Sequence, residues 1–288
     1  PRTKIKLLLR EHFYPDPLGR NTVGKQEDLQ NLTDAKCKQI VAENFNISDL
    51  KELGKIKASD IPPAFEGGNN QNSKFILGKL NGKNVIVVKG RFHFYDGYKM
   101  RDIGHVIYVL KSLGVKKLIT VDEVGHLNPR FSTGEIAFIY DHINLMGDNP
   151  LIGKNDDELG VRFPDMSNAY DRNLYSKVYK ILQDNKVRIN EAIYVGTTGP
   201  ESETDAEARF YREIGGDVVG YSTAAENITA VHCGMKHIAL GLITRDLVAD
   251  KMMEDSRNDA ERTKDKKKAL STASAIAGKI IKDIVKNI

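Results

Sequence analysis

The chain has 288 residues, of which 40% are hydrophobic and 28% charged. This composition is that of a globular protein with a sizeable core, and it excludes a disordered chain. The formal net charge is +4 and the acidic and basic residues are interleaved, so no nucleic-acid-binding surface is predicted. The sequence shows no apolar run of membrane-spanning length and no recognisable signal peptide.

The cysteines and the glycosylation sequons bear on the cellular compartment. Cys37 and Cys233 are too few for a disulfide framework and fit a reducing environment. We therefore expect a cytoplasmic protein. Sequons at Asn31, Asn46 and Asn227 keep secretion as an alternative.

Apolar periodicity and turn residues predict strands and helices in alternation. The predicted strands are Lys4–Leu9, Phe75–Leu80, Asn84–Val88, Lys117–Val121, Ile136–Tyr140, Ala192–Thr197, Asp217–Gly220 and His237–Thr244. The predicted helices are Asp34–Phe45, Arg101–Leu113, Asn168–Leu182, Asp205–Gly216, Ala224–Cys233 and Ala260–Val285. Asn81-Gly82 predicts a hairpin turn. The alternation predicts an α/β fold: one domain over residues 1–288, with a mixed, largely parallel central sheet flanked by helices.

Polar side chains gather after the predicted strands, where α/β proteins bind ligands. Arg91, His93 and Tyr95 alternate after the second hairpin strand, and together they suit an anion beside a sugar. Glu203 follows a Gly-Pro turn, and Ser222 follows a short apolar strand. These residues predict a pocket. An exposed strand end and an ordinary helix cap are the structural alternatives.

Three polar residues at the ends of predicted strands raise the question of a metal site. His126, Asp141 and His142 also follow predicted strands, but they lack the spacing of known zinc motifs. We expect structural histidines here and no metal site.

Several motifs, in the right order, resemble signatures of the trimeric, low-molecular-mass purine nucleoside phosphorylase family. They are Gly90–Tyr98, Leu127–Phe131, Asp141–Leu145, Arg162–Arg172 and Val219–Thr223. The resemblance covers nearly the whole chain. It implies cleavage of a purine nucleoside by phosphate into free base and ribose 1-phosphate. It also implies a homotrimer with phosphate as co-substrate and no cofactor. The interleaved charges and the lack of a long apolar run predict no nucleic-acid or membrane partner.

The resemblance further implies roles for individual residues. Phosphate would be held by Arg91, His93 and Ser222. Ribose would be contacted by Tyr95, Tyr221, Asp259 and a neighbouring subunit's Phe163. The base would be contacted by Ser202, Glu203, Thr244 and Arg245. The catalytic residues would be His93, Glu203 and Arg245.

The chain departs from the family pattern at several of these ligand positions. A glycine-serine-glycine phosphate loop is replaced by Arg10-Glu11-His12, and Glu123 stands where a small residue meets phosphate. Ser202 replaces an aromatic residue, Tyr221 a methionine and Asp259 a histidine. Arg245 replaces the asparagine that protonates the leaving base.

Arg245 is the departure with the clearest structural consequence. We expect it to pair with Glu203 or Glu123 and to occupy part of the purine site. The alternative is that it bends outward to Asp246 or Asp259.

Two functions of different classes remain open. One is a divergent phosphorylase; the other is a catalytically inactive relative kept as a binding, storage or structural homo-oligomer. A nucleoside hydrolase that uses water is a third. The presence of Arg91, His93, Tyr95, Glu203 and Ser222 favours the phosphorylase.

Overall fold

The computed structural model describes residues 38–42, 50–57, 74–252 and 254–288. The strands are β1 (Lys38–Ala42), β2 (Lys51–Lys57), β3 (Lys74–Leu80), β4 (Lys83–Lys89), β5 (Lys117–His126), β6 (Ile136–Asn144), β7 (Asn190–Gly196), β8 (Val218–Gly220) and β9 (Lys236–Asp246). The helices are the 3-10 turn η2 (Phe94–Asp96), α3 (Met100–Ser112), α4 (Arg172–Asp184), α5 (Asp205–Glu213), α6 (Thr223–His232), α7 (Ala249–Met252) and α8 (Asp259–Asn287).

The strands form one mixed sheet that closes partly on itself. Their order is β2-β3-β4-β1-β5-β8-β7-β6-β9, and β5 also pairs with β9. The strands β5, β8, β7, β6 and β9 therefore make a small closed barrel, from which β1, β4, β3 and β2 extend. Parallel pairs join β1 to β4 and β5, β5 to β9, and β7 to β6 and β8. The other pairs are antiparallel.

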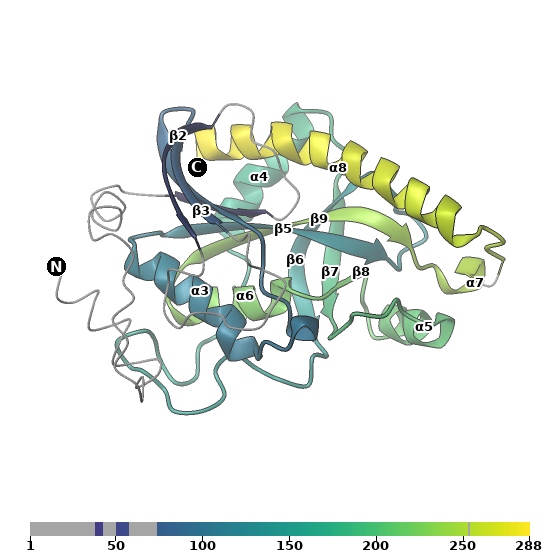
Figure 1. The fold of residues 1–288 in the computed structure, drawn as a ribbon, viewed down its shortest axis with the longest axis horizontal. Coiled ribbons are helices and arrows are strands. Elements are labelled where there is room, and N and C mark those ends of the chain that lie inside the picture. The colour runs from purple at the N-terminus through teal and green to yellow at the C-terminus, as the bar shows by residue number, and fades with distance from the viewer. Residues whose placement is uncertain (1–37, 43–49, 58–73, 253) are drawn as a thin grey trace.

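Helices cover both faces of this sheet (Figure 1). On one face α8 and α4 pack on apolar side chains of β4, β5 and β9, such as Val87, Ile119 and Leu240. On the other face α3 and α6 pack on Phe75, Ile86 and Leu118. These two buried layers confirm the predicted α/β fold class.

The predicted hairpin is present. Asn81 and Gly82 have φ values of 50° and 74°, and they join β3 to β4 with Leu80 opposite Lys83. Both residues tolerate positive φ, which a two-residue hairpin of this twist requires.

The helix predicted at Asp34–Phe45 is wrong where the structure describes it, because Lys38–Ala42 is strand β1. This segment lies between β4 and β5 and runs parallel to both. Its two β-branched residues, Ile40 and Val41, fit a strand better than a helix. The rest of that predicted helix, and the strand predicted at Lys4–Leu9, lie outside the described residues.

Other strands differ from the prediction in existence or length. The sequence pattern did not predict β2, an edge strand with exposed charged residues such as Lys51 and Glu52. Residues 122–126 are predicted as a loop but continue β5, because all of them pair with β9 and Gly125 and His126 also pair with β8. Likewise residues 141–144 continue β6 beside β7.

The structure describes two of the residues that bear on the cellular compartment, Asn227 and Cys233. Asn227 is fully buried, and its amide donates to the Ala169 carbonyl at 2.9 Å, so the folded chain does not present this sequon. Asn31, Asn46 and Cys37 lie outside the described residues. Cys233 is a buried free thiol whose pKa burial raises to about 11. Among the described helices, none is long and apolar enough to cross a membrane.

A buried histidine makes the stability depend on pH. His237 lies 2.9 Å from Thr120 Oγ1 and 2.7 Å from the Asn227 amide, and burial lowers its pKa to about 3. The unfolded chain therefore binds a proton below pH ~6.5 that the folded chain does not. The free energy of unfolding should fall by about 1.4 kcal/mol per pH unit from this residue as the pH drops from 6.5.

His237→Asn should reduce the pH slope of stability by that amount between pH 6.5 and 5, as measured by urea unfolding. Thr120→Val is the matched control, because it removes the hydrogen bond but no titrating group. Thr120→Val should lower the free energy of unfolding equally at pH 6.5 and at pH 5. Equal slopes in wild type and His237→Asn would contradict the assignment.

Candidate functional site

Arg91 is the centre of a buried charge cluster at the end of β4. It is only 3% exposed. Its Nε and Nη2 donate to the two carboxylate oxygens of Glu226 on α6, both at 2.8 Å. Its Nη1 donates to Asp122 Oδ1 on β5 at 2.9 Å and to the Val121 carbonyl at 3.1 Å. One guanidinium thus ties three elements of the fold together.

The cluster contains two carboxylates and one guanidinium. Burial raises the pKa of Glu226, an effect that Arg91 partly offsets and the nearby Asp122 charge strengthens. Breaking such a buried pair leaves an uncompensated charge in a medium of low dielectric constant. The position of Arg91 is therefore set by the fold before any ligand binds.

His93, Ser222 and Tyr95 lie together beside this cluster. Ser222 Oγ is 2.9 Å from His93 Nδ1, and the His93 ring stacks on Tyr95 with centroids 4.6 Å apart. Tyr95 in turn meets the ring of Tyr221 edge-on, at 6.0 Å between centroids. The structure thus brings two of the residues predicted for phosphate, His93 and Ser222, together with two of those predicted for ribose, Tyr95 and Tyr221.

The expected ion pair of Arg245 is present, and its partner is Glu203. Arg245 Nη1 donates to Glu203 Oε2 at 2.6 Å and to Ser202 Oγ at 3.1 Å. The guanidinium carbon lies 5.5 Å from the centre of the Tyr221 ring. The Tyr221 hydroxyl donates to Glu203 Oε1 at 3.2 Å. Ser202, Glu203, Tyr221 and Arg245 therefore form one connected group, hereafter the base-side cluster.

Arg245 and Tyr221 keep their protonation states at neutral pH. Burial lowers the pKa of Arg245, but the Glu203 carboxylate outweighs this and holds it above the ordinary value. Burial raises the pKa of Tyr221 to about 12, with Arg245 and Glu203 acting in opposite directions. Arg245 is therefore a permanent cation and Tyr221 a neutral phenol.

Glu123 forms an ion pair with a lysine of α8. Lys266 Nζ lies 2.8 Å from Glu123 Oε1, and the Thr244 hydroxyl donates to the same oxygen at 3.1 Å. Thr244 lies where the pairing of β5 and β9 shifts register, next to Arg245. This bulge sends Thr244 to Glu123 and Arg245 to Glu203. Sequence reasoning missed Lys266 because its dense basic run is typical of an exposed helix face.

Two of the predicted site residues stand apart from these clusters. Asp259 is an exposed residue in the first turn of α8. Phe163 is 87% exposed in the loop 147–164. Asp122, Tyr194 and Glu226 are structural partners of the site that the sequence analysis did not single out.

The histidines expected to be structural have protein partners. His126 Nδ1 lies 3.0 Å from the Asn128 carbonyl, and His142 Nδ1 lies 3.3 Å from the Tyr170 hydroxyl. Within the part of the chain that the structure describes, no group of three histidine, cysteine or acidic residues could hold a metal ion.

Arg91→Gln should lower the free energy of unfolding by about 3–5 kcal/mol at pH 7, because it leaves Asp122 and Glu226 buried without their cation. The loss should be smaller at pH 5. Burial already raises the pKa of Glu226, and without Arg91 it rises further, so this side chain takes up a proton in acid.

Denaturant unfolding at both pH values measures this effect. The control is Arg188→Gln, since Arg188 pairs with Glu135 at an exposed position and should change stability by less than about 0.5 kcal/mol. A loss that does not depend on pH would contradict the charge argument.

The chain is similar in sequence to proteins of a known family. The family model for the phosphorylase superfamily matches residues 46–286. The chain is 43% identical over 240 residues to purine nucleoside phosphorylase 1 of Bacillus subtilis, covering 78% of this chain and 88% of that one. It is 37% identical over 218 residues to the purine nucleoside phosphorylase of Bos taurus, covering 74% and 73%.

The solved structures show the same likeness. A crystal structure of Schistosoma purine nucleoside phosphorylase in complex with hypoxanthine superposes with a TM-score of 0.81 at 30% identity, covering 91% of this chain and 95% of that one. With the family model, the relatives and the superposition in agreement, the chain belongs to the purine nucleoside phosphorylases of the phosphorylase superfamily.

Proposed function

We propose that this protein cleaves purine nucleosides with phosphate, giving the free base and ribose 1-phosphate, without a further cofactor. The observation that carries the proposal is the edge contact of Tyr95 and Tyr221, 6.0 Å between centroids. It joins the His93–Ser222 pair to the base-side cluster, so residues suited to an anion, a sugar and a base are contiguous. Structures of similar proteins are titled as complexes with hypoxanthine, guanosine, inosine and ribose 1-phosphate.

In this mechanism Arg91, His93 and Ser222 hold phosphate beneath the sugar. Tyr95 and Tyr221 contact the ribose as positive charge develops on it. The departing purine gains negative charge, and a fixed cation beside it lowers the barrier. Arg245 supplies that cation. It does not transfer a proton, because Glu203 holds its pKa above the ordinary value for arginine. The bond from C1′ to the base breaks as the bond from C1′ to phosphate forms, and the purine anion takes up the proton that hydrogen phosphate gives up.

Arg245 also favours 6-oxopurines. A guanidinium carries only donors, and the O6 and N7 atoms of a 6-oxopurine are both acceptors that an arginine fork can bond. Adenine presents an amino donor at that position. Glu203 then accepts from the opposite edge of the ring, once the ligand has replaced part of its bond to Arg245.

Two features support an active enzyme over the inactive alternative. Similar proteins over most of the chain are named purine nucleoside phosphorylases. Glu123, the carboxylate at a phosphate-contacting position, is held in an ion pair with Lys266. It therefore does not repel phosphate as a free charge would.

A homotrimer and a cytoplasmic location are also part of the proposal. The loop 147–164 exposes three apolar residues, Ile152, Val161 and Phe163, and such a patch is typical of a subunit interface. Phe163 would reach the sugar of a neighbouring subunit's site. The free thiol of Cys233 is consistent with a reducing compartment.

The proposal predicts release of hypoxanthine from inosine only when phosphate is present, followed by ultraviolet absorbance or chromatography. Guanosine should react similarly and adenosine at least about a hundredfold more slowly, since an unmatched donor faces Arg245. Release without phosphate would indicate the hydrolase instead. No release, with no purine binding by calorimetry, would indicate the inactive relative.

Arg245→Ala should lower kcat/KM for inosine by about a hundred- to a thousandfold, the cost of one transition-state donor. Arg245→Asn should recover part of that loss and reduce the preference over adenosine, because an amide can also accept. Arg209→Ala is the control, since Arg209 pairs with Asp205 on the exposed side of α5. Unchanged inosine turnover in Arg245→Ala would contradict the assigned role.

Lys266→Ala should raise the KM for phosphate about fivefold and leave the KM for inosine unchanged, because Glu123 loses its cation. Its neighbour Lys267 is exposed, and Lys267→Ala should have no effect. A rise in phosphate KM that is the same in both variants would indicate general loss of positive charge rather than the Glu123 pair.

A further inference from the structure

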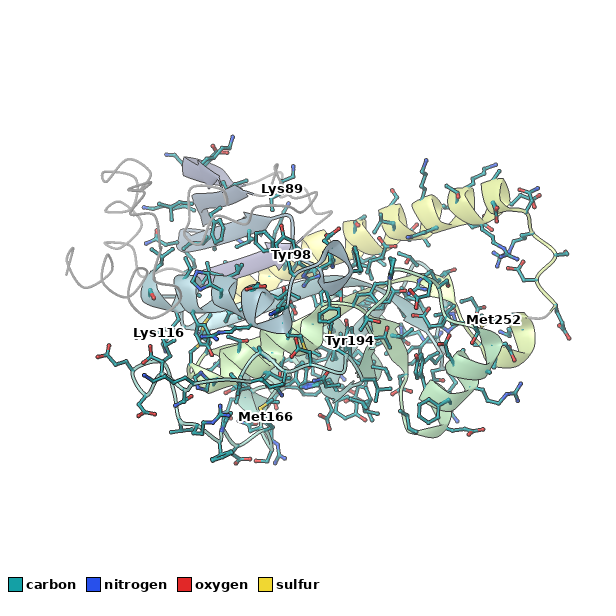
Figure 2. The ribbon with its side chains drawn as sticks, turned by 60° about the horizontal axis from the view of Figure 1, so that its bottom comes forward. Lys89, Tyr98, Lys116, Met166, Tyr194 and Met252 are labelled. Atoms are coloured by element: carbon teal, nitrogen blue, oxygen red, sulfur yellow. The ribbon has the colours of Figure 1, made fainter. Side chains whose placement is uncertain are left out.

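Tyr194 is a fully buried side chain of β7, in the interior of the molecule (Figure 2). Its hydroxyl donates to Asp122 Oδ2 at 2.7 Å. The Tyr194 hydroxyl oxygen accepts from the backbone N–H groups of Ser222 at 3.0 Å and Thr223 at 3.3 Å. A phenol can donate one hydrogen bond and accept two, so these three bonds fill the hydrogen-bonding capacity of the Tyr194 hydroxyl. The backbone N–H groups can only donate to the phenol oxygen, so the phenol proton points to Asp122.

This arrangement fixes the position of Ser222. Ser222 is the N-cap residue of α6, and a serine there usually bonds the helix N–H groups with its own hydroxyl. In this chain its side chain makes no capping bond. Tyr194 accepts from the N–H groups of Ser222 itself and of Thr223, and the Ser222 hydroxyl lies 2.9 Å from His93 Nδ1.

Tyr194 acts on Arg91 through Asp122 as well. Asp122 Oδ2 accepts from Tyr194 and, at 3.1 Å, from the Thr223 hydroxyl. Its other oxygen accepts from Arg91 Nη1. Bonds on both oxygens hold the plane of the carboxylate, and that plane sets where the guanidinium lies. The phenol is therefore linked to both halves of the phosphate site, Ser222 on one side and Arg91 on the other.

The backbone leaves room for this one hydroxyl. A Cβ atom at Gly220 would lie 2.7 Å from the Tyr194 oxygen and 3.0 Å from Asp122 Oδ2. Only glycine allows the phenol to approach the strand and the helix start so closely. Burial and the Asp122 charge also raise the pKa of Tyr194 well above its ordinary value, so the hydroxyl keeps its proton.

We propose that Tyr194 is a positioning residue for phosphate: its hydroxyl holds the backbone N–H groups of Ser222 and Thr223, fixes the Ser222 hydroxyl beside His93, and orients Asp122 and Arg91. The inference rests on the proposed function, since it concerns the same phosphate site. It assigns Tyr194 no contact with substrate.

The test is steady-state phosphorolysis of inosine by wild type, Tyr194→Phe, Ser222→Ala and the double variant. Tyr194→Phe should raise the KM for phosphate about ten- to a hundredfold, the effect of losing a hydrogen bond in a charged network. The KM for inosine should stay within about twofold. Because Tyr194 acts partly through Ser222, its substitution should cost less in the Ser222→Ala background.

Tyr175→Phe is the matched control, because the Tyr175 hydroxyl also donates to a carboxylate, that of Glu191, away from the site. It should leave both KM values unchanged. Equal rises in the two KM values for Tyr194→Phe, or fully additive effects with Ser222→Ala, would overturn the inference and indicate a structural role alone.

Failure of the proposed function is separately visible. A wild type without phosphorolysis refutes that function, and the inference is then judged by calorimetric titration with inorganic phosphate. Weaker phosphate binding by Tyr194→Phe than by wild type supports it, and equal or absent binding overturns it. Should Tyr194→Phe not fold, Asp122→Asn tests the same link. An unchanged phosphate KM in that variant also overturns the inference.

Discussion

The contact on which the site depends is the bond of Arg91 to Asp122 and Glu226. It joins the end of β4 to β5 and α6, with Nε and Nη2 both 2.8 Å from Glu226. Because the group is buried, losing one partner would leave a charge that water cannot reach. The protein therefore holds its anion-side groups in one geometry in the absence of ligand. Such preorganisation is what electrostatic catalysis requires.

The base side follows a different principle. Glu203 and Arg245 satisfy each other at 2.6 Å, and Tyr221 lies against both. In the proposed function a purine shares or replaces that pair, because the two side chains satisfy each other in this structure. Glu123 and Lys266 form a second departure of this kind, in which a carboxylate and its cation occur together.

How far the sequence could predict the structure is seen in particular elements. Asn81-Gly82 predicted its hairpin because that turn is local. The strand at Lys38–Ala42 was missed, since its register with β4 and β5 depends on segments distant in the chain. The site residues from Arg91 to Ser222 could be listed from motifs. Tyr194, Asp122, Glu226 and Lys266 could not, because each acts through a contact across many residues.

The sequence by itself determined the fold class and the family, because these follow from local pattern and ordered motifs. It also nominated Arg91, His93, Tyr95, Glu203, Ser222 and Arg245 as candidate site residues. Only the tertiary structure decided which partner each one has. Arg245 had three acidic candidates besides Glu203, and packing of β9 against β5 selected Glu203. Ion pairs and buried hydrogen bonds depend on distance and burial, and both exist only once the chain has folded.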